Sequence, residues 1–263
     1  RSEFPSVALI VADNATDETL TVYDLDDPAM PVWMVFNVGG SYPSQYMLGE
    51  TGWGNIHSVY ALNGRLYVAR NVAGVVEIDF ANDHASRYST DGQHRYGSIA
   101  NRNADSDDII RDSSAAIVNG TVNDVAATVL EGAEIGALGL PIPTIAVATD
   151  SGASVIHGGS GKVYDISSSS THNDFHKIFF TDDNRVGVGF ESNSTYDIAS
   201  YVGLHAIPYA DNTGVSSSAG WSELYNPTGY GGLVTTTAAA SSTNSAVNAV
   251  VPTSEKGLAI GYP

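Results

Sequence analysis

The 263-residue chain contains no Cys, and its 29 acidic residues outnumber 11 basic ones to give a formal net charge of −18 at pH 7. A hydrophobic fraction of 43% is high enough to build a core, so the composition excludes a disordered chain. The acidic excess comes without any block of Lys or Arg, which makes nucleic acid and membrane insertion poor candidates. Only 15% of residues are charged, and the abundant small polar residues are typical of strands and turns. The composition predicts an all-β fold.

A short strand-like segment recurs along the chain, and each copy ends on Ala or Gly after a β-branched residue. The copies are residues 9–12, 66–69, 145–148, 186–189 and 258–261. A second recurring strand lies upstream of four of them, at residues 55–60, 124–129, 174–179 and 246–251. The first of these pairs is joined by Asn63-Gly64, a strong hairpin signal. We therefore expect residues 55–62 to pair antiparallel with residues 65–70, and residues 175–180 with residues 185–190.

Further strands follow these hairpins, for example at residues 74–78 and 163–166. Four short antiparallel strands repeated at intervals of roughly 40 to 80 residues are typical of the blades of a β-propeller. The repeat predicts one propeller-like domain over residues 1–263, with about four blades plus partial blades. A β-sandwich is the alternative. Because the last hairpin ends beside Pro263, we expect the chain to be part of a longer protein.

Three longer connections interrupt the repeat, at residues 91–123, 131–143 and 210–245. Such insertions on a rigid β scaffold are where binding functions are commonly found. The segment 131–143 is apolar and rich in Gly, although no blade strand requires its apolar residues. We expect Ile135, Leu138, Leu140 and Ile142 to bury against another subunit or another part of the assembly, and we expect a homo-oligomer.

Two histidines, His57 and His176, fall in one column of the repeat, which Ala126 and Asn248 complete. In a propeller this column would lie on the strand nearest the axis, where the side chains could bind a metal or a polar ligand. The alternative is that each imidazole is structural and hydrogen bonds to a backbone carbonyl.

Three aromatic residues, Trp221, Tyr225 and Tyr230, lie in the polar connection 210–245. Aromatic rings stack well on the apolar faces of sugars, so these residues are candidates for binding a glycan. The alternative is that they cap a neighbouring blade.

Acidic residues gather at Asp105, Asp107, Asp108 and Asp112. Ca²⁺ favours such oxygen clusters, yet the spacing lacks the Gly and the Glu of an EF-hand loop, and a solvated acidic loop is the alternative. Asp124 and Asp174 are aligned in the repeat and could face one channel, although each also suits an Asx turn. The sequence contains no Gly-x-Ser-x-Gly or His-Glu-x-x-His motif. We assign no catalytic residue, no metal ligand and no required cofactor.

Residues 145–156, 161–166 and 173–185 together resemble propeller repeats in large structural proteins of tailed bacteriophages. Members of that class act as tail fibres, tailspikes or other virion appendages. The resemblance implies a virion or extracellular location, assembly with neighbouring subunits and attachment to host surface polysaccharide. It supplies no catalytic residues. The leading hypothesis is a non-enzymatic appendage protein, and the alternative is an extracellular carbohydrate-active enzyme with carboxylates in a propeller channel.

Overall fold

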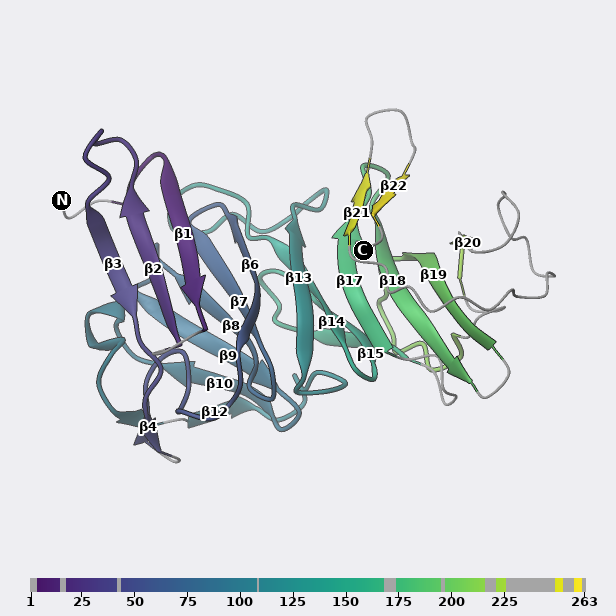
Figure 1. Ribbon diagram of the computed structural model, residues 1–263, viewed down its shortest axis with the longest axis horizontal. Coiled ribbons are helices and arrows are strands. Elements are labelled where there is room, and N and C mark those ends of the chain that lie inside the picture. The colour runs from purple at the N-terminus through teal and green to yellow at the C-terminus, as the bar shows by residue number, and fades with distance from the viewer. Residues whose placement is uncertain are drawn as a thin grey trace.

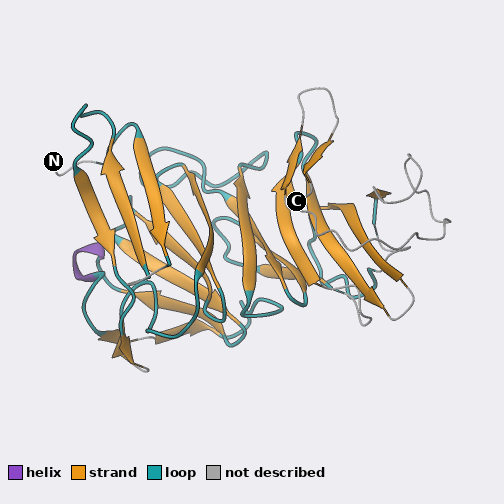
Figure 2. Cartoon of the chain, viewed as in Figure 1, coloured by secondary structure: helices purple, strands orange, loops and turns teal. Residues whose placement is uncertain are grey.

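The computed structural model describes residues 4–14, 18–41, 44–107, 109–167, 174–194, 197–215, 221–225, 249–252 and 258–261. Within these residues the chain is built from antiparallel strands and one short 3₁₀ turn, η1 (Ile99–Asn101), as Figure 2 shows. The all-β prediction is therefore confirmed. None of the helical structure in the described ranges is long and apolar enough to cross a membrane.

Five sheets follow one another along the chain (Figure 1). Sheet I contains β1 (Ala8–Asp13), β2 (Thr19–Asp24) and β3 (Val32–Phe36). Sheet II contains six strands, β6 (Ile56–Leu62), β7 (Arg65–Arg70), β8 (Gly74–Asp79), β9 (His84–Ser89), β10 (Gly92–Tyr96) and β12 (Ile109–Asp112).

Sheets III and IV are four-stranded meanders. Sheet III contains β13 (Val122–Thr128), β14 (Thr144–Thr149), β15 (Gly152–Ile156) and β16 (Val163–Ile166). Sheet IV contains β17 (Asp174–Phe180), β18 (Arg185–Ser194), β19 (Asp197–Ala206) and β20 (Glu223–Tyr225). Sheet V pairs β21 (Ala249–Pro252) with β22 (Leu258–Gly261), and a small separate sheet pairs β4 (Gly40–Ser41), β5 (Ser44–Gln45) and β11 (Ser106–Asp107).

Both predicted hairpins are confirmed. β6 pairs antiparallel with β7 in sheet II, with Tyr60 opposite Tyr67, and β17 pairs with β18 in sheet IV, with Ile178 opposite Val188. The first strands of sheets II to V contact one another in succession, β6 with β13, β13 with β17 and β17 with β21. The sheets that begin with these four strands stand side by side in Figure 1, and we call the four strands the inner strands.

The core lies between neighbouring sheets, and β7 shows why its sequence is apolar at nearly every position. Leu66 and Val68 pack with residues of sheet I, while Tyr67 and Ala69 pack with residues of sheet III. Side chains alternate between the two faces of a strand, so a strand with a sheet on each side needs apolar residues on both. Sheet I differs, because its edge strand β1 leaves Leu9 46% and Val11 39% exposed.

The first strands of sheets II, III and IV each carry one extra residue near their start. The register shifts between Ile56 and Ser58 in β6, between Val122 and Asp124 in β13, and between Phe175 and Lys177 in β17. The bulged residues are therefore His57, Asn123 and His176.

This register corrects the sequence alignment. Asn123, three residues before Ala126, is the structural equivalent of His57 and His176. The predicted equivalence of Asp124 with Asp174 is wrong for the same reason. A bulge leaves no signature in the alternation of apolar residues, so the sequence alignment placed β13 three residues out of register. The Ala or Gly column of the second strands is aligned correctly, because Ala69, Ala148 and Gly189 each pair with the residue after a bulge.

Two of the bulged side chains, His57 and Asn123, link their sheet to the next one. His57 Nδ1 donates to the Val122 carbonyl oxygen at 3.0 Å, and Asn123 Nδ2 donates to the Phe175 carbonyl oxygen at 3.0 Å. Asn14, just after β1, makes the corresponding contact from sheet I, because its amide exchanges two hydrogen bonds of 2.9 Å with the backbone of Ile56. We call this repeated contact the bulge ladder.

The segment 91–123, expected as a connection, contributes β10 and β12 to sheet II. These two strands widen sheet II beyond the four-stranded pattern of sheets III and IV.

Candidate functional site

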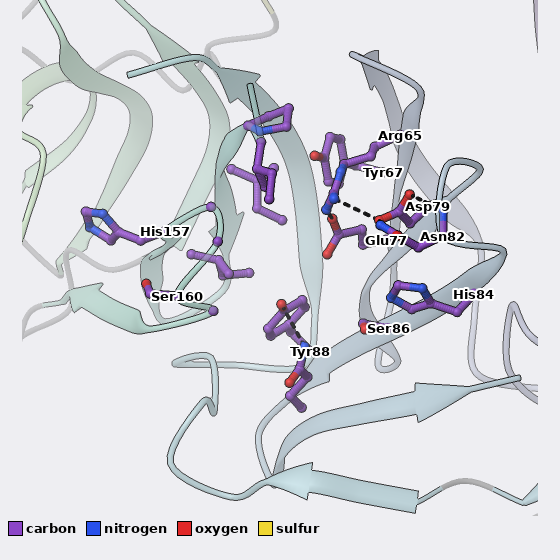
Figure 3. Close-up of a pocket in the computed structure, with 18 of the residues that line it drawn as sticks. Arg65, Tyr67, Glu77, Asp79, Asn82, His84, Ser86, Tyr88, His157 and Ser160 are labelled. Carbon is purple, nitrogen blue, oxygen red and sulfur yellow. Dashed lines mark hydrogen bonds and ion pairs between the residues drawn. The ribbon is translucent and has the colours of Figure 1, made fainter. Parts of the chain in front are cut away.

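A cavity of about 300 Å³ opens between sheets II and III. Strands β7 to β10 and β12 form one wall, and the other wall comes from sheet III, near residues 142–145 and 156–161 (Figure 3). We call this cavity the intersheet cleft. Its polar lining consists of Arg65, Tyr67, Glu77, Asp79, Asn82, His84, Ser86, Tyr88, Gln93, Arg95, Arg111, His157 and Ser160.

The sheet II wall is built from cross-strand rows of polar side chains. Tyr67 lies opposite Glu77, Glu77 opposite Ser86, and Ser86 opposite Arg95. In the neighbouring row Arg65 lies opposite Asp79, and Asp79 opposite His84. Because directly opposite residues in a sheet share a face, these rows present their side chains together toward sheet III.

Arg65 forms ion pairs with both carboxylates of the wall. One of its guanidinium nitrogens donates to Glu77 Oε1 at 2.5 Å, and the other lies 2.8 Å from Asp79 Oδ2. Asp79 also accepts from Asn82 Nδ2 at 2.8 Å and from the backbone N–H groups of Ala81 and Asn82. Burial raises the pKa of Glu77, and Arg65 opposes that shift. Arg65 therefore offsets one unit of the negative charge that Glu77 and Asp79 can carry.

Two tyrosine hydroxyls are buried in the same wall. The Tyr88 hydroxyl accepts from Gln93 Nε2 at 2.9 Å. The Tyr67 residue is only 1% exposed, and its buried hydroxyl has no hydrogen-bond partner among the described residues. Burial raises the pKa of both phenols, with the Glu77 carboxylate acting in the same direction. Both groups stay protonated, so Tyr67 holds a free donor beside Arg65, as Figure 3 shows.

Arg95 and Arg111 form the cationic side of the cleft. Arg95 Nη2 lies 3.1 Å from His84 Nε2, and burial together with the charge of Arg95 lowers the pKa of His84. His84 is thus a neutral acceptor for Arg95 at neutral pH. Across the described part of the chain, neither Arg95 nor Arg111 forms an ion pair with a carboxylate.

The sheet III wall is apolar where it faces these charges. Its aliphatic lining comes from Ile142, Pro143, Ile145 and Ile156, and a turn over residues 158–161 completes the rim. Gly158 approaches another segment closely, since a Cβ there would lie 2.5 Å from the Pro143 carbonyl oxygen. The cleft therefore combines one polar wall with one aliphatic wall.

The two predicted histidines lie outside this cleft. His57 is used in the bulge ladder, which is the backbone-carbonyl role that sequence reasoning kept as its alternative. His176 Nε2 lies 3.8 Å from Asp174 Oδ1 on the same strand. No group of three or more His, Asp or Glu residues in the described ranges is arranged to hold a metal ion.

The aromatic candidates are only partly covered by the structure. The Trp221 ring stacks on Phe190 at 5.1 Å and 19°, with Phe175 at 5.9 Å, and it covers Gly203. These contacts are those expected if Trp221 caps sheet IV. Tyr225 lies in β20, where its backbone pairs with Val202. Tyr230 lies outside the described residues.

The candidate carboxylates are dispersed. Asp112 accepts from the backbone N–H and the hydroxyl of Ser114 in an Asx turn, and Asp108 lies outside the described ranges. Asp124 accepts from the Ile178 N–H at 3.2 Å and lies 3.6 Å from Lys177 Nζ, so it links β13 to β17. It lines a second, wider hollow of about 600 Å³ over the inner strands β6, β13 and β17.

The residues of the intersheet cleft were not predicted from the sequence, because most of them lie neither on the recurring first strands nor in the aromatic and acidic loops. Their signal is polar alternation within the outer strands, as in Arg65-x-Tyr67, Glu77-x-Asp79 and His84-x-Ser86. Three consecutive strands with polar residues on one face indicate a wetted face.

The comparisons with known proteins leave the chain as an all-β protein with a polar cleft between two sheets. The chain matches no protein-family model and no curated protein. Among solved structures it is similar to the computationally designed Ika8 protein, with 11% identity and a TM-score of 0.37 over 99% of this chain and 79% of that one. Similarity at this level assigns neither fold nor function.

Proposed function

We propose that the chain is a non-enzymatic recognition module of a virion appendage and that it is folded as a β-propeller. In this proposal the module binds surface glycans in the intersheet cleft. The segment 131–143 would contact neighbouring subunits. The proposed location is the virion or the extracellular space, and no cofactor is required.

The repeated arrangement of the sheets supports the propeller. Sheets III and IV are meanders whose first strand is innermost, and sheet II begins in the same way. The inner strands contact one another in chain order, and the bulge ladder repeats the same contact between successive sheets. Successive meanders with neighbouring inner strands are the arrangement that radial blades require.

The binding function is proposed from the composition of the intersheet cleft. A sugar presents hydroxyl groups around its rim and C–H groups on its faces. The cleft offers donors and acceptors on the sheet II wall and aliphatic side chains on the sheet III wall. Its volume of about 300 Å³ lies at the small end of the range for ligand sites, which suits a short saccharide unit.

One feature favours the enzymatic alternative. Burial raises the pKa of Glu77, as in carboxyl groups that act as general acids in glycoside cleavage. Such cleavage also needs a second available carboxylate, and the neighbouring Asp79 is saturated by Arg65, Asn82 and backbone N–H groups. Within the described lining of the cleft this leaves Glu77 without a catalytic partner, so binding without turnover is the better supported function.

The test is a binding screen against bacterial surface polysaccharides and their oligosaccharides, using a cleft-filling variant. Ser160 is exposed on the cleft rim, so Ser160→Trp should block the cleft without disturbing the core. Thr51→Trp, at an exposed turn that does not line the cleft, is the matched control. We expect binding by the wild type and by Thr51→Trp and its loss in Ser160→Trp. Equal binding by both variants would remove the cleft from the proposal, and release of reducing ends would establish the enzyme.

A further inference from the structure

We propose that the intersheet cleft selects acidic saccharides because Arg95 and Arg111 bind a carboxylate on the sugar. This inference rests on the proposed glycan-binding function and names the class of ligand.

Positive charge is concentrated at the cleft. The chain carries only 11 Lys and Arg residues against 29 acidic ones, yet three of its arginines line this one cleft. Arg65 is neutralised by Glu77 and Asp79. Arg95 and Arg111 keep their charge without a carboxylate partner in the described residues. In an acidic protein this leaves a local positive field, and a cleft with low-dielectric walls focuses such a field on an anion.

Arg95 and Arg111 lie on strands that sheets III and IV lack. Arg95 lies on β10 and Arg111 on β12, the strands that sheet II adds to the four-stranded pattern. The β10–β12 register passes from Gln93 opposite Asp112 to His94 opposite Ile110, which makes Arg111 the bulged residue. Bulges re-aim side chains at functional sites. The added strands therefore supply the cationic side of the cleft.

In the described part of the chain, the Tyr67 hydroxyl is a free hydrogen-bond donor at the opposite end of the polar row from Arg95. Arg95, Ser86, Glu77 and Tyr67 lie on four successive strands, so the row spans roughly 14 Å at the usual strand spacing. The buried Tyr67 hydroxyl has no hydrogen-bond partner among the described residues. An unsatisfied buried hydroxyl costs free energy unless a ligand oxygen or a water accepts a hydrogen bond from it. A saccharide with its carboxylate at Arg95 can place ring hydroxyls along this row.

An oxyanion on a sugar can be a carboxylate or a sulfate ester, and a guanidinium binds both. The carboxylate is preferred because its two coplanar oxygens match the planar fork of Arg. The cleft also holds Glu77 close to Arg95, so a group with a single negative charge fits better than a phosphate ester with nearly two.

The experiment compares three probes by isothermal titration calorimetry: an oligogalacturonate, the same oligosaccharide after reduction of its carboxyl groups, and a sulfated neutral oligosaccharide of equal length. Arg95→Gln and Arg111→Gln are the test variants. Both side chains are exposed, so the fold should be retained, and circular dichroism verifies this. Lys162→Gln is the matched control, because Lys162 is an exposed cation beside the cleft that does not line it.

We expect the oligogalacturonate to bind at least about tenfold more tightly than its reduced form, with an advantage that shrinks as salt is added. Each Arg variant should lower the affinity for the oligogalacturonate by about tenfold and leave that for the reduced form unchanged, while Lys162→Gln should change neither.

Equal or tighter binding of the reduced form would overturn the acidic-saccharide inference and leave the proposed glycan-binding function standing. Tighter binding of the sulfated probe would overturn the assignment to a carboxylate. Failure of all three probes, together with failure of the polysaccharide screen described above, would overturn the proposed function itself.

Discussion

A single carboxyl group, Asp165 on β16, couples the stability of sheet III to pH. Burial raises its pKa to about 6, the nearby Asp211 acts in the same direction, and a hydrogen bond from the Ser154 hydroxyl opposes the shift. The folded protein therefore holds the Asp165 proton more tightly than the unfolded chain does between about pH 4 and pH 6. Over that interval ionisation of Asp165 lowers stability as the pH rises.

We predict that Asp165→Asn flattens this part of the pH profile, because the amide cannot ionise and its oxygen can still accept from Ser154. The measurement is Tm from pH 4 to pH 7 for both proteins. The wild type should lose stability relative to Asp165→Asn as the pH rises through about 6. Parallel profiles would show that Asp165 does not control this transition.

Trp221 offers a second test on a single side chain. Its ring covers Gly203 and stacks on Phe190 and Phe175. Trp221→Ala should destabilise the protein by about 2–3 kcal/mol, below the cost for a fully buried ring because Trp221 is only partly buried. A decrease of several degrees in Tm should follow, and Trp221→Phe should recover most of it. An unchanged Tm in Trp221→Ala would show that the ring does not cap sheet IV.

At the scale of the element, the bulge ladder assigns one task to two different residue types. His57 and Asn123 each donate from a bulge to the backbone carbonyl of the next inner strand. An Asn at position 57 should reproduce the contact, whereas Ala cannot. We predict that His57→Ala lowers the free energy of unfolding by about 1 kcal/mol and that His57→Asn lowers it by much less. Urea unfolding measures both values, and equal losses would contradict the ladder.

The elements also show which features the sequence alone can predict. The hairpin β6–β7 was predictable because Asn63-Gly64 has a specific turn geometry between two alternating strands; the φ angles are +52° for Asn63 and +74° for Gly64. The position of Asn123 was not, because a bulge changes register without changing the apolar pattern. The cleft brings together residues of two sheets, such as Arg95 of sheet II and Ile156 of sheet III. That arrangement arises only from tertiary packing.

At the scale of the whole molecule, the segment 131–143 remains a candidate for association. An isolated bridge between Ile135 and Pro141 closes this segment into a loop, and its apolar tip is open to solvent in the single chain. Ile135 is 59%, Leu138 58% and Leu140 43% exposed. Three exposed aliphatic side chains on one short loop are typical of a contact with another subunit.

We predict that the double variant Leu138→Ser and Leu140→Ser weakens self-association without lowering Tm by more than about 1 °C, because both side chains are exposed. Sedimentation velocity over a range of concentrations measures the association. A wild-type chain that stays monomeric at all concentrations would refute the assignment of this loop to a homo-oligomeric contact.

The open edge of sheet I has a consequence for amide hydrogen exchange. β7, between β6 and β8, is hydrogen bonded on both sides, whereas β2 is the one partner of β1 among the described strands. Half of the N–H groups of β1 therefore point toward β2 and half toward the open edge. Deuterium uptake along β1 should alternate between slow and fast with a period of two residues, while β7 should be slow throughout. Residue-resolved exchange by NMR measures this contrast, and uniformly slow exchange in β1 would mean that another strand occupies this edge in solution.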